Sequence, residues 1–291
     1  MELYLNEIED ALYEVLPEPA EGQFNKVLIE AMRYSLLCGG KRVRPALTLA
    51  FCELCGAKID RAIPFACAIE MVHTYSLIHD DLPAMDNDDM RRGSPTNHKV
   101  FGEDIAILAG DSLLTKAFEI ILYIEGKSDE EIIGSARAAE VLAKYSGEKG
   151  MVGGQCIDLK VEKNADIEIV TAMDMGKTVA LIKAACKMGC IAAGATEEEI
   201  LAASEYAVGI GMAFQIKDDL LDVLGDAALL GKNVGMDSER YKTNYVSILG
   251  IKECERLVNQ YTLNAVKSLE AFNRDSSFLK EFALSLADRV K

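Results

Sequence analysis

The sequence predicts an all-α protein, and three observations lead to that prediction. Half of the 291 residues are apolar, and Ala, Leu, Ile and Glu, which favour helix over strand, dominate the composition. The chain has only six prolines and no tryptophan. Apolar residues recur at spacings of three and four, which is the period of an amphipathic helix. Because no stretch has the composition of a linker, we expect one domain over residues 1–291.

The helical period identifies eight segments, and turn residues separate them. The predicted helices span residues 25–37, 45–55, 62–82, 105–124, 131–145, 168–193, 198–224 and 251–271. Glycine-containing turns follow several of them, such as Gly39-Gly40 and Gly93-Ser94-Pro95. Thr196 is a predicted helix start, because Glu199 three residues later completes a capping box.

Charge and cysteine content exclude several classes of protein. The 31 Lys and Arg residues against 47 Asp and Glu residues give a net charge of −16, so nucleic acid is not an expected partner. The eight cysteines are expected to be reduced, and the Cys52 and Cys55 pair lacks the second pair that a zinc site needs. No apolar run reaches the length of a membrane span, and the N-terminus is acidic. We therefore expect a cytoplasmic protein without an integral membrane segment.

Two of the predicted helices, 62–82 and 198–224, are apolar for most of their length and end in aspartates. The first motif is Asp-Asp-Leu-Pro-Ala-Met-Asp at 80–86, and the second is Asp-Asp-Leu-Leu-Asp at 218–222. Buried carboxylates without partners are costly, so these acids should meet solvent, cations or metal ions. Helical geometry places His73 and Asp80, seven residues apart, on one face. Carboxylates of this kind, together with water and phosphate oxygens, suit Mg²⁺.

Basic residues accompany the acidic motifs and provide ligands for a diphosphate. They are Lys41, Arg42, Arg44, Arg91, Arg92, Lys177, Lys217, Lys232 and Lys242. The alternative interpretation is that each of these side chains is exposed to solvent and binds no ligand. Gly176-Lys177-Thr178 resembles the end of a phosphate-binding P-loop, but Thr171 stands where that loop needs a glycine and the surrounding pattern is helical.

Many of these motifs, in this order, resemble the trans-prenyl diphosphate synthases, of the bacterial farnesyl and plant-type geranylgeranyl branch. The resemblance extends from about Gly39 to Gly250, through Gly-Gly-Lys-Arg-Val-Arg-Pro at 39–45, His73, Asp80–Asp86, Arg91-Arg92-Gly93, Gly110-Asp111, Gly154-Gln155, Lys177-Thr178, Phe214-Gln215, Asp218–Asp222 and Gly231-Lys232. It implies the isoprenoid synthase fold, a single domain of long helices around a deep central cavity, and a homodimer. The two aspartate motifs would face each other across the mouth of that cavity.

The resemblance also implies the residues of the site. Asp80, Asp86 and Asp218 would bind Mg²⁺, with three ions per site when substrate is bound, and Asp81, Asp219, Asp222 and Lys177 would complete the catalytic set. Arg91, Lys177, Thr178, Gln215 and Lys232 would hold an allylic diphosphate, dimethylallyl or geranyl. Lys41, Arg44, His73 and Arg92 would hold isopentenyl diphosphate. In the implied reaction the allylic substrate ionises and isopentenyl diphosphate attacks the cation. The condensation product then loses a proton to the released diphosphate, so His73 is not assigned as a general base.

The residues before Asp80 are expected to set the length of the product. Tyr75 and Ser76 precede the first motif, and the bulky Tyr75 resembles the arrangement in bacterial farnesyl synthases. A geranylgeranyl diphosphate synthase is the alternative, followed by a terpene cyclase and a non-catalytic partner subunit. An intact isopentenyl pocket argues against a cyclase, and two complete aspartate motifs argue against a silent subunit. One departure from the family is Asn244-Tyr245-Val246, where Thr-Tyr-Pro is usual.

Overall fold

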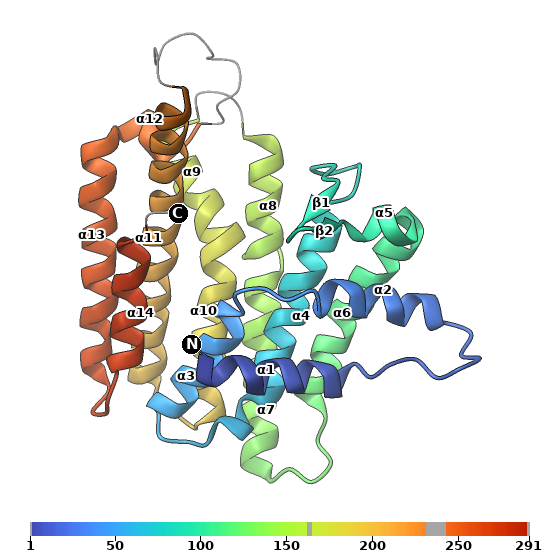
Figure 1. The fold of residues 1–291 in the computed structure, drawn as a ribbon. Coiled ribbons are helices and arrows are strands. Elements are labelled where there is room, and N and C mark those ends of the chain that lie inside the picture. The colour runs from blue at the N-terminus through green and yellow to red at the C-terminus, as the bar shows by residue number, and fades with distance from the viewer. Residues whose placement is uncertain (1, 162–164, 231–242, 290–291) are drawn as a thin grey trace. The chain divides into compact units, whose positions relative to one another are not determined.

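The computed structural model describes residues 2–161, 165–230 and 243–289, and this part of the chain is helical almost throughout (Figure 1). Its only strands are β1 (Met90–Arg91) and β2 (Ser94–Pro95), which form one antiparallel pair. The prediction of an all-α fold is confirmed. Among the described helices, none combines the length and the apolar character that crossing a bilayer requires.

Contacts within the chain group it into two compact units. The first unit contains residues 1–142 and 184–195, and the second contains residues 143–183 and 196–291. Two helices continue from one unit into the other: α7 (Asp129–Ser146) and α10 (Ala180–Ala192). The assignment of residues 1–291 to one domain stays a prediction, and the two units are described separately below.

The first unit is built around α4 (Ile63–Asp80), which packs mainly on α6 (Glu103–Leu122) and α3 (Val43–Leu54). Its other elements are α1 (Glu2–Val15), α2 (Lys26–Leu36), η1 (Ile59–Arg61) and α5 (Asn97–Phe101). Pro64 lies in the first turn of α4, where its missing N–H costs nothing. Residues 65–72 are buried on every side of the helix, as expected for a central helix that is apolar all round.

The second unit is built around the 34-residue helix α11 (Glu197–Leu230), which packs along α13 (Ile251–Ser268). Its other elements are α8 (Met151–Lys160), α9 (Ile167–Asp174), the π-helix η2 (Met175–Val179), α12 (Tyr245–Leu249), η3 (Leu269–Ala271) and α14 (Ser277–Ala287). The predicted capping box at the start of α11 is confirmed, because the Thr196 N–H donates to the Glu199 carboxylate at 2.9 Å and the Glu199 N–H donates to the Thr196 hydroxyl at 3.2 Å.

All eight predicted helices are present. The predicted segment 168–193 consists of α9, η2 and α10 in succession, and η2 explains why the helical period continues through Gly176-Lys177-Thr178. The period did not identify α1, α5, α8, α12 or α14. Two of these, α5 and α12, have five residues each, and α8 contains Gly153-Gly154, which weakens a helical signal.

Candidate functional site

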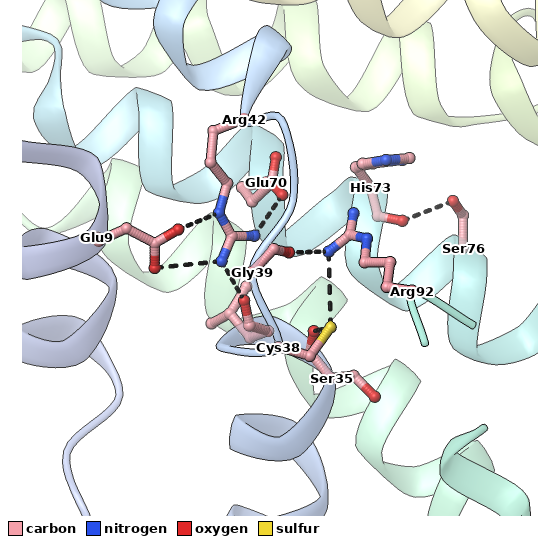
Figure 2. A network of polar contacts seen from close by, with 10 residues as sticks. Glu9, Ser35, Cys38, Gly39, Arg42, Glu70, His73, Ser76 and Arg92 are labelled. Carbon is pink, nitrogen blue, oxygen red and sulfur yellow. Dashed lines mark hydrogen bonds and ion pairs between the residues drawn. The ribbon is translucent and has the colours of Figure 1, made fainter. Parts of the chain in front are cut away.

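The loop before α3 in the first unit is fitted closely to Arg92. One Arg92 Nη donates to the carbonyl of Gly39 at 2.5 Å and lies 3.7 Å from the Cys38 sulfur (Figure 2). Gly40 has a φ of +138°, and a Cβ at this position would lie 3.0 Å from the guanidinium carbon of Arg92. The absence of a side chain at Gly40 therefore lets a guanidinium lie against the loop backbone.

Arg42, within the same basic motif, is occupied by structural contacts. Its guanidinium bonds to Glu9 at 2.6 Å, to Glu70 at 2.6 Å and to the carbonyl of Leu36 at 2.8 Å (Figure 2). The Arg42 side chain is fully buried, and its backbone has a φ of +46°. Arg42 thus ties α1 and α4 to the start of α3, and all three of its guanidinium nitrogens make hydrogen bonds within the protein.

Arg44 and His73 lack a comparable set of partners in the described part of the chain. The Nε of Arg44 is buried and makes no hydrogen bond there. Burial lowers the pKa of Arg44, a change that the charge of Glu70 opposes and the charge of Arg92 reinforces. Burial also places the pKa of His73 well below its usual value, and the charges of Arg44 and Arg92 lower it further. The result is a neutral imidazole beside the half-buried Arg44 and the exposed Arg92, an arrangement that suits a bound anion.

Lys41, the remaining predicted ligand of isopentenyl diphosphate, is exposed on the same loop. The structure therefore brings Arg44, His73 and Arg92 together, with Lys41 beside them in the chain.

The first aspartate motif is a closed loop at the end of α4. The Asp86 N–H donates to the carbonyl of Asp80 at 2.9 Å, so the two ends of the motif meet. Asp81 is buried, and Arg91 Nε donates to it at 2.6 Å; Arg91 also pairs with Asp88 at 3.2 Å. Burial raises the pKa of Asp81, and Arg91 opposes that change. Asp81 thus anchors the loop, whereas Asp80 is half-buried and Asp86 is exposed.

Beneath Asp80, aromatic side chains pack closely. Tyr75 is buried and meets His79 edge to face, with ring centroids 5.7 Å apart. Burial, and then the nearby charge of Asp80, raise the pKa of Tyr75 to about 12. A Cβ at Gly110 would lie 2.1 Å from the His79 imidazole, so this glycine on α6 makes room for the ring. The hydroxyl of Ser76 donates to the carbonyl of His73 at 2.8 Å. Tyr75, and not Ser76, is therefore the bulky group at this level.

In the second unit, the aspartates at 218–222 have different surroundings. Asp218 accepts a hydrogen bond from Arg289 at 3.1 Å. Asp219 accepts from the backbone N–H of Tyr245 at 2.8 Å. Burial raises the pKa of Asp219 to about 6, and the charges of Asp222 and Asp218 add to the effect while the Tyr245 bond opposes it. Asp222 is exposed.

The departure from the family at Asn244-Tyr245-Val246 has a structural explanation. Asn244 is the N-cap of α12, and it forms a capping box with Ser247, with bonds of 2.8 Å and 3.1 Å. An Asn cap starts this helix without a proline. It also places the Tyr245 N–H against Asp219.

Lys177 and Thr178 lie on η2, and π-helical turns often occur at functional sites. The Lys177 ammonium pairs with Asp158 of α8 at 2.6 Å. The two elements approach backbone to backbone, because a Cβ at Gly154 would lie 2.0 Å from the nitrogen of Lys177. Of the predicted allylic ligands, Gln215 donates to Asp174 at 3.2 Å, and Lys232 lies outside the described residues.

The aspartates fit a hard divalent cation in their chemistry. Asp219 lies beside Asp218 and Asp222, and their mutual repulsion is of the kind that a bound cation relieves. Within the described ranges, no cluster of three or more carboxylate, imidazole or thiol groups is arranged to hold a metal alone. Mg²⁺ takes one or two protein carboxylates and completes its shell with water and phosphate oxygens.

Sequence reasoning missed Arg42, Asp158, Asp174 and Arg289 as partners in these networks. No local pattern identifies them, since each contact joins residues that are 19 or more positions apart.

The chain is similar to known proteins over most of its length. Residues 25–277 match a family model described as polyprenyl synthetase. The chain is 44% identical to a chloroplastic geranylgeranyl pyrophosphate synthase of Capsicum annuum, with 93% of this chain and 73% of that protein aligned. It is 42% identical to a dimethylallyltranstransferase of Fischerella ambigua, with 99% and 82% aligned. An apo crystal structure of an FPP/GFPP synthase from Zymomonas mobilis has a TM-score of 0.86 at 35% identity and covers 98% of this chain and 96% of its own.

Proposed function

The chain belongs to the polyprenyl synthetase family and is a chain-elongating prenyltransferase, and we propose that it condenses isopentenyl diphosphate with dimethylallyl and geranyl diphosphate to give farnesyl diphosphate. The group of Arg44, His73 and Arg92 carries this proposal. It sets two guanidinium groups beside a neutral imidazole, it lies on the same unit as Asp80, and a one-substrate cyclase has no use for it.

In this proposal the two substrates bind to different sets of residues. Lys41, Arg44, His73 and Arg92 hold isopentenyl diphosphate, and the neutral His73 donates a hydrogen bond without adding charge. The allylic diphosphate is held by Arg91, Lys177, Thr178, Gln215 and Lys232. In the structure Arg91 pairs with Asp81, and Lys177 pairs with Asp158. When the diphosphate binds, each cation would leave its carboxylate or contact both anions.

Asp80, Asp86 and Asp218 would hold Mg²⁺, with three ions per substrate-bound site. When bound, Mg²⁺ neutralises charge on the diphosphate and makes it a better leaving group. The other acids have supporting roles in this proposal. Asp81 fixes Arg91, Asp219 fixes the start of α12, and Asp222 adds negative charge at the solvent-exposed end.

The reaction follows from charge stabilisation. The allylic C–O bond breaks, its electron pair leaves with the diphosphate, and the basic side chains stabilise that developing charge. The double bond of isopentenyl diphosphate then attacks the allylic cation and forms the new C–C bond. A proton leaves the adjacent carbon for the released diphosphate, so no strongly basic side chain is required.

Tyr75 supports a C15 product, because a buried aromatic ring five residues before Asp80 on α4 limits the depth available to the growing chain. A C20 product is the second candidate, since several relatives at 44–46% identity are named geranylgeranyl pyrophosphate synthases. Purified protein with Mg²⁺, isopentenyl diphosphate and each allylic diphosphate distinguishes the two, by chromatography of the dephosphorylated products. A dominant C20 alcohol would replace the farnesyl assignment, and no condensation at all would refute the synthase.

We also propose that the protein is a homodimer. The exposed side chains of Ile107 and Leu108 on α6, at 44% and 50% exposure, supply apolar surface for a second copy. Light scattering coupled to size-exclusion chromatography measures the mass in solution. The mass of two chains is expected, and the mass of one chain would refute the homodimer.

A further inference from the structure

Strands β1 and β2 form a hairpin (Figure 1) that carries two of the proposed diphosphate ligands, Arg91 and Arg92. Its turn contains Arg92 and Gly93, with φ of +52° and +80°, so both central residues are left-handed, as in a type I′ turn. This conformation is costly for a residue with a side chain, and each strand has only two residues. The hairpin therefore depends on contacts at its base for a fixed position.

Thr96, the residue after β2, makes such contacts at the base of the hairpin. Its backbone N–H donates to the carbonyl of Asp89 at 3.0 Å, and its hydroxyl donates to the carbonyl of Asp88 at 2.8 Å. Thr96 is also the N-cap of α5, where a threonine hydroxyl commonly bonds to the helix, but in the described structure it makes no capping bond. The hydroxyl of this buried residue thus fixes the loop before the hairpin and does not cap its own helix.

His98, two residues further on, determines the direction of the Thr96 hydroxyl. Its Nδ1 lies 3.2 Å from Thr96 Oγ1, and both residues are buried. A threonine hydroxyl has one hydrogen and a carbonyl only accepts, so the hydrogen that bonds to Asp88 is not available to the imidazole. Nδ1 must then carry a hydrogen and donate to Oγ1. Nε2 is buried and has no partner among the described residues, which suits the unprotonated nitrogen of a neutral ring better than a second N–H.

Asp88 connects this chain of bonds to the proposed allylic site. Its carboxylate accepts from Arg91 at 3.2 Å, and Arg91 also donates to the buried Asp81 at 2.6 Å. Asp86 lies two residues before Asp88, and its N–H is bonded within the aspartate motif. The loop from Asp86 to Asp88 is thus held at one end by the aspartate motif and at the other end by Thr96.

We propose that Thr96 is a positioning residue for the allylic site. Held by the Nδ1–H form of His98, its hydroxyl keeps the Asp88 carbonyl in place. It thereby sets the positions of Asp86 and Arg91, which bind Mg²⁺ and the diphosphate in the proposed function. The inference rests on that function. Thr96 itself need not touch a substrate.

The isopentenyl site provides an internal comparison. Arg92, the hairpin residue assigned to isopentenyl diphosphate, bonds to the carbonyl of Gly39. The hydroxyl of Tyr34 on α2 donates to the carbonyl of Pro95 at 2.8 Å and so ties the same hairpin to a second element. These bonds do not involve the side chain of Thr96. Loss of its hydroxyl should therefore weaken the binding of the allylic substrate and Mg²⁺ and leave the binding of isopentenyl diphosphate almost unchanged.

The first test measures the direction of the bonds in the wild-type protein, without any activity. The chain has three histidines, so ¹⁵N labelling of histidine gives three pairs of ring-nitrogen signals. His98→Gln removes one pair and assigns it. At about pH 8, where an ordinary histidine is neutral, we expect His98 to carry its proton on Nδ1 and none on Nε2. An unprotonated Nδ1 would overturn the proposal.

The second test compares Thr96→Val, which removes the hydroxyl at nearly constant shape, with Thr96→Ser, which keeps it. We expect Thr96→Val to raise the KM for geranyl diphosphate and the half-saturating concentration of Mg²⁺ roughly 3- to 10-fold, the range for loss of one hydrogen bond. The KM for isopentenyl diphosphate should stay within about twofold, because its site keeps its own bonds. Thr96→Ser should stay within about twofold of the wild type in every constant.

Thr262→Val is the matched control for lost stability. Thr262 is 3% exposed and its hydroxyl donates to the carbonyl of Val258 at 2.8 Å, but it lies on α13 and belongs to neither proposed substrate site. We expect urea denaturation to show a loss of stability in both Thr262→Val and Thr96→Val. Only Thr96→Val should raise the KM for geranyl diphosphate, and equal kinetic changes in the two variants would overturn the positioning role.

The outcomes separate this proposal from the function on which it rests. An active wild type with unchanged constants in Thr96→Val would overturn the positioning role alone, and so would a Thr96→Ser that is as impaired as Thr96→Val. Equal rises in the KM values of both substrates would place the effect in the whole hairpin and would also overturn it. A wild type that makes no condensation product would overturn the proposed function and, with it, the role of Thr96, even where the His98 signals are as expected.

Discussion

Replacing Arg42 by methionine should destabilise the protein strongly, although the residue belongs to a motif that first indicates substrate binding. The Arg42 side chain is fully buried, and that of Glu70 is 2% exposed, with 2.6 Å between the paired atoms. Removing one member of a buried ion pair leaves the other charge buried and unpaired, which costs about 3–5 kcal/mol. Glu9 is 33% exposed and can regain water, so the loss of its bond to Arg42 should add only about 0.2–1 kcal/mol to the destabilisation.

Urea denaturation, followed by circular dichroism, measures this loss, and two further variants identify its cause. Arg42→Met/Glu70→Met removes both charges, so we expect it to regain most of the stability, to within about 1 kcal/mol of the wild type. Arg256→Met is the matched control, because Arg256 makes a two-bond pair with Glu253 at 2.7 and 2.9 Å but both side chains are exposed. Its unfolding midpoint should hardly change.

Two results would refute this reasoning about Arg42. One is a loss in Arg42→Met no larger than that in Arg256→Met, which would mean that burial adds nothing to the pair. The other is a double variant that is less stable than either single variant, which would mean that the methionines disrupt packing and that the charges are not the cause.

Three further predictions concern other parts of the structure. Gly154→Ala should cost about 1–3 kcal/mol in urea denaturation because its Cβ would overlap the backbone of Lys177, whereas Gly134→Ala, with its nearest neighbour at 3.8 Å, should be neutral or stabilising by up to about 1 kcal/mol. Tyr75→Ala should lengthen the main product seen by chromatography and Tyr75→Phe should not; an unchanged product in Tyr75→Ala would place the cavity floor elsewhere. Asp174→Asn should gain stability over the wild type as pH rises. The folded pKa of about 7 exceeds the ordinary 3.8, so the stability contributed by the protonated carboxyl is present below pH 4 and lost on rising through pH 7. The difference between the two denaturation curves should therefore grow across this window, by at most on the order of 4 kcal/mol, and a constant difference would contradict the assignment.

The sequence predicts the helices well, because each long helix buries one face and so keeps a period near 3.6. Residues 62–82 and 198–224 correspond to α4 and α11, and their apolar bodies are buried as expected. The period does not reveal η2, because a single π-turn inserts one residue without interrupting the apolar pattern. Nor does it reveal the backbone contact between α8 and η2, which depends on the glycines at 154 and 176.

The basic residues of the site were harder to assign, because a sequence shows which residues are charged but not which charges are already paired. Arg42 and Arg44 are two positions apart in one motif, yet Arg42 bonds to Glu9 and Glu70, whereas the Nε of Arg44 has no partner in the described part of the chain. Their roles differ because Arg42 pairs with Glu70 and Glu9, which lie 28 and 33 positions away in the chain. Such long-range pairing has no local signal.

The same distinction between paired and unpaired charge applies in both units. Around Arg42, one cation meets two carboxylates and a carbonyl, so the charges are satisfied and the group stabilises the fold. Burial, and then the neighbouring guanidinium groups, lower the pKa of the His73 imidazole. Burial, and then the neighbouring carboxylates, raise the pKa of the Asp174 carboxyl. One group has an excess of positive charge and the other an excess of negative charge, and each excess costs stability in the free protein. In the proposed reaction, a diphosphate would supply the missing charge to the first group, and cations would supply it to the second. Groups whose charge the fold leaves uncompensated are therefore candidates for a functional role.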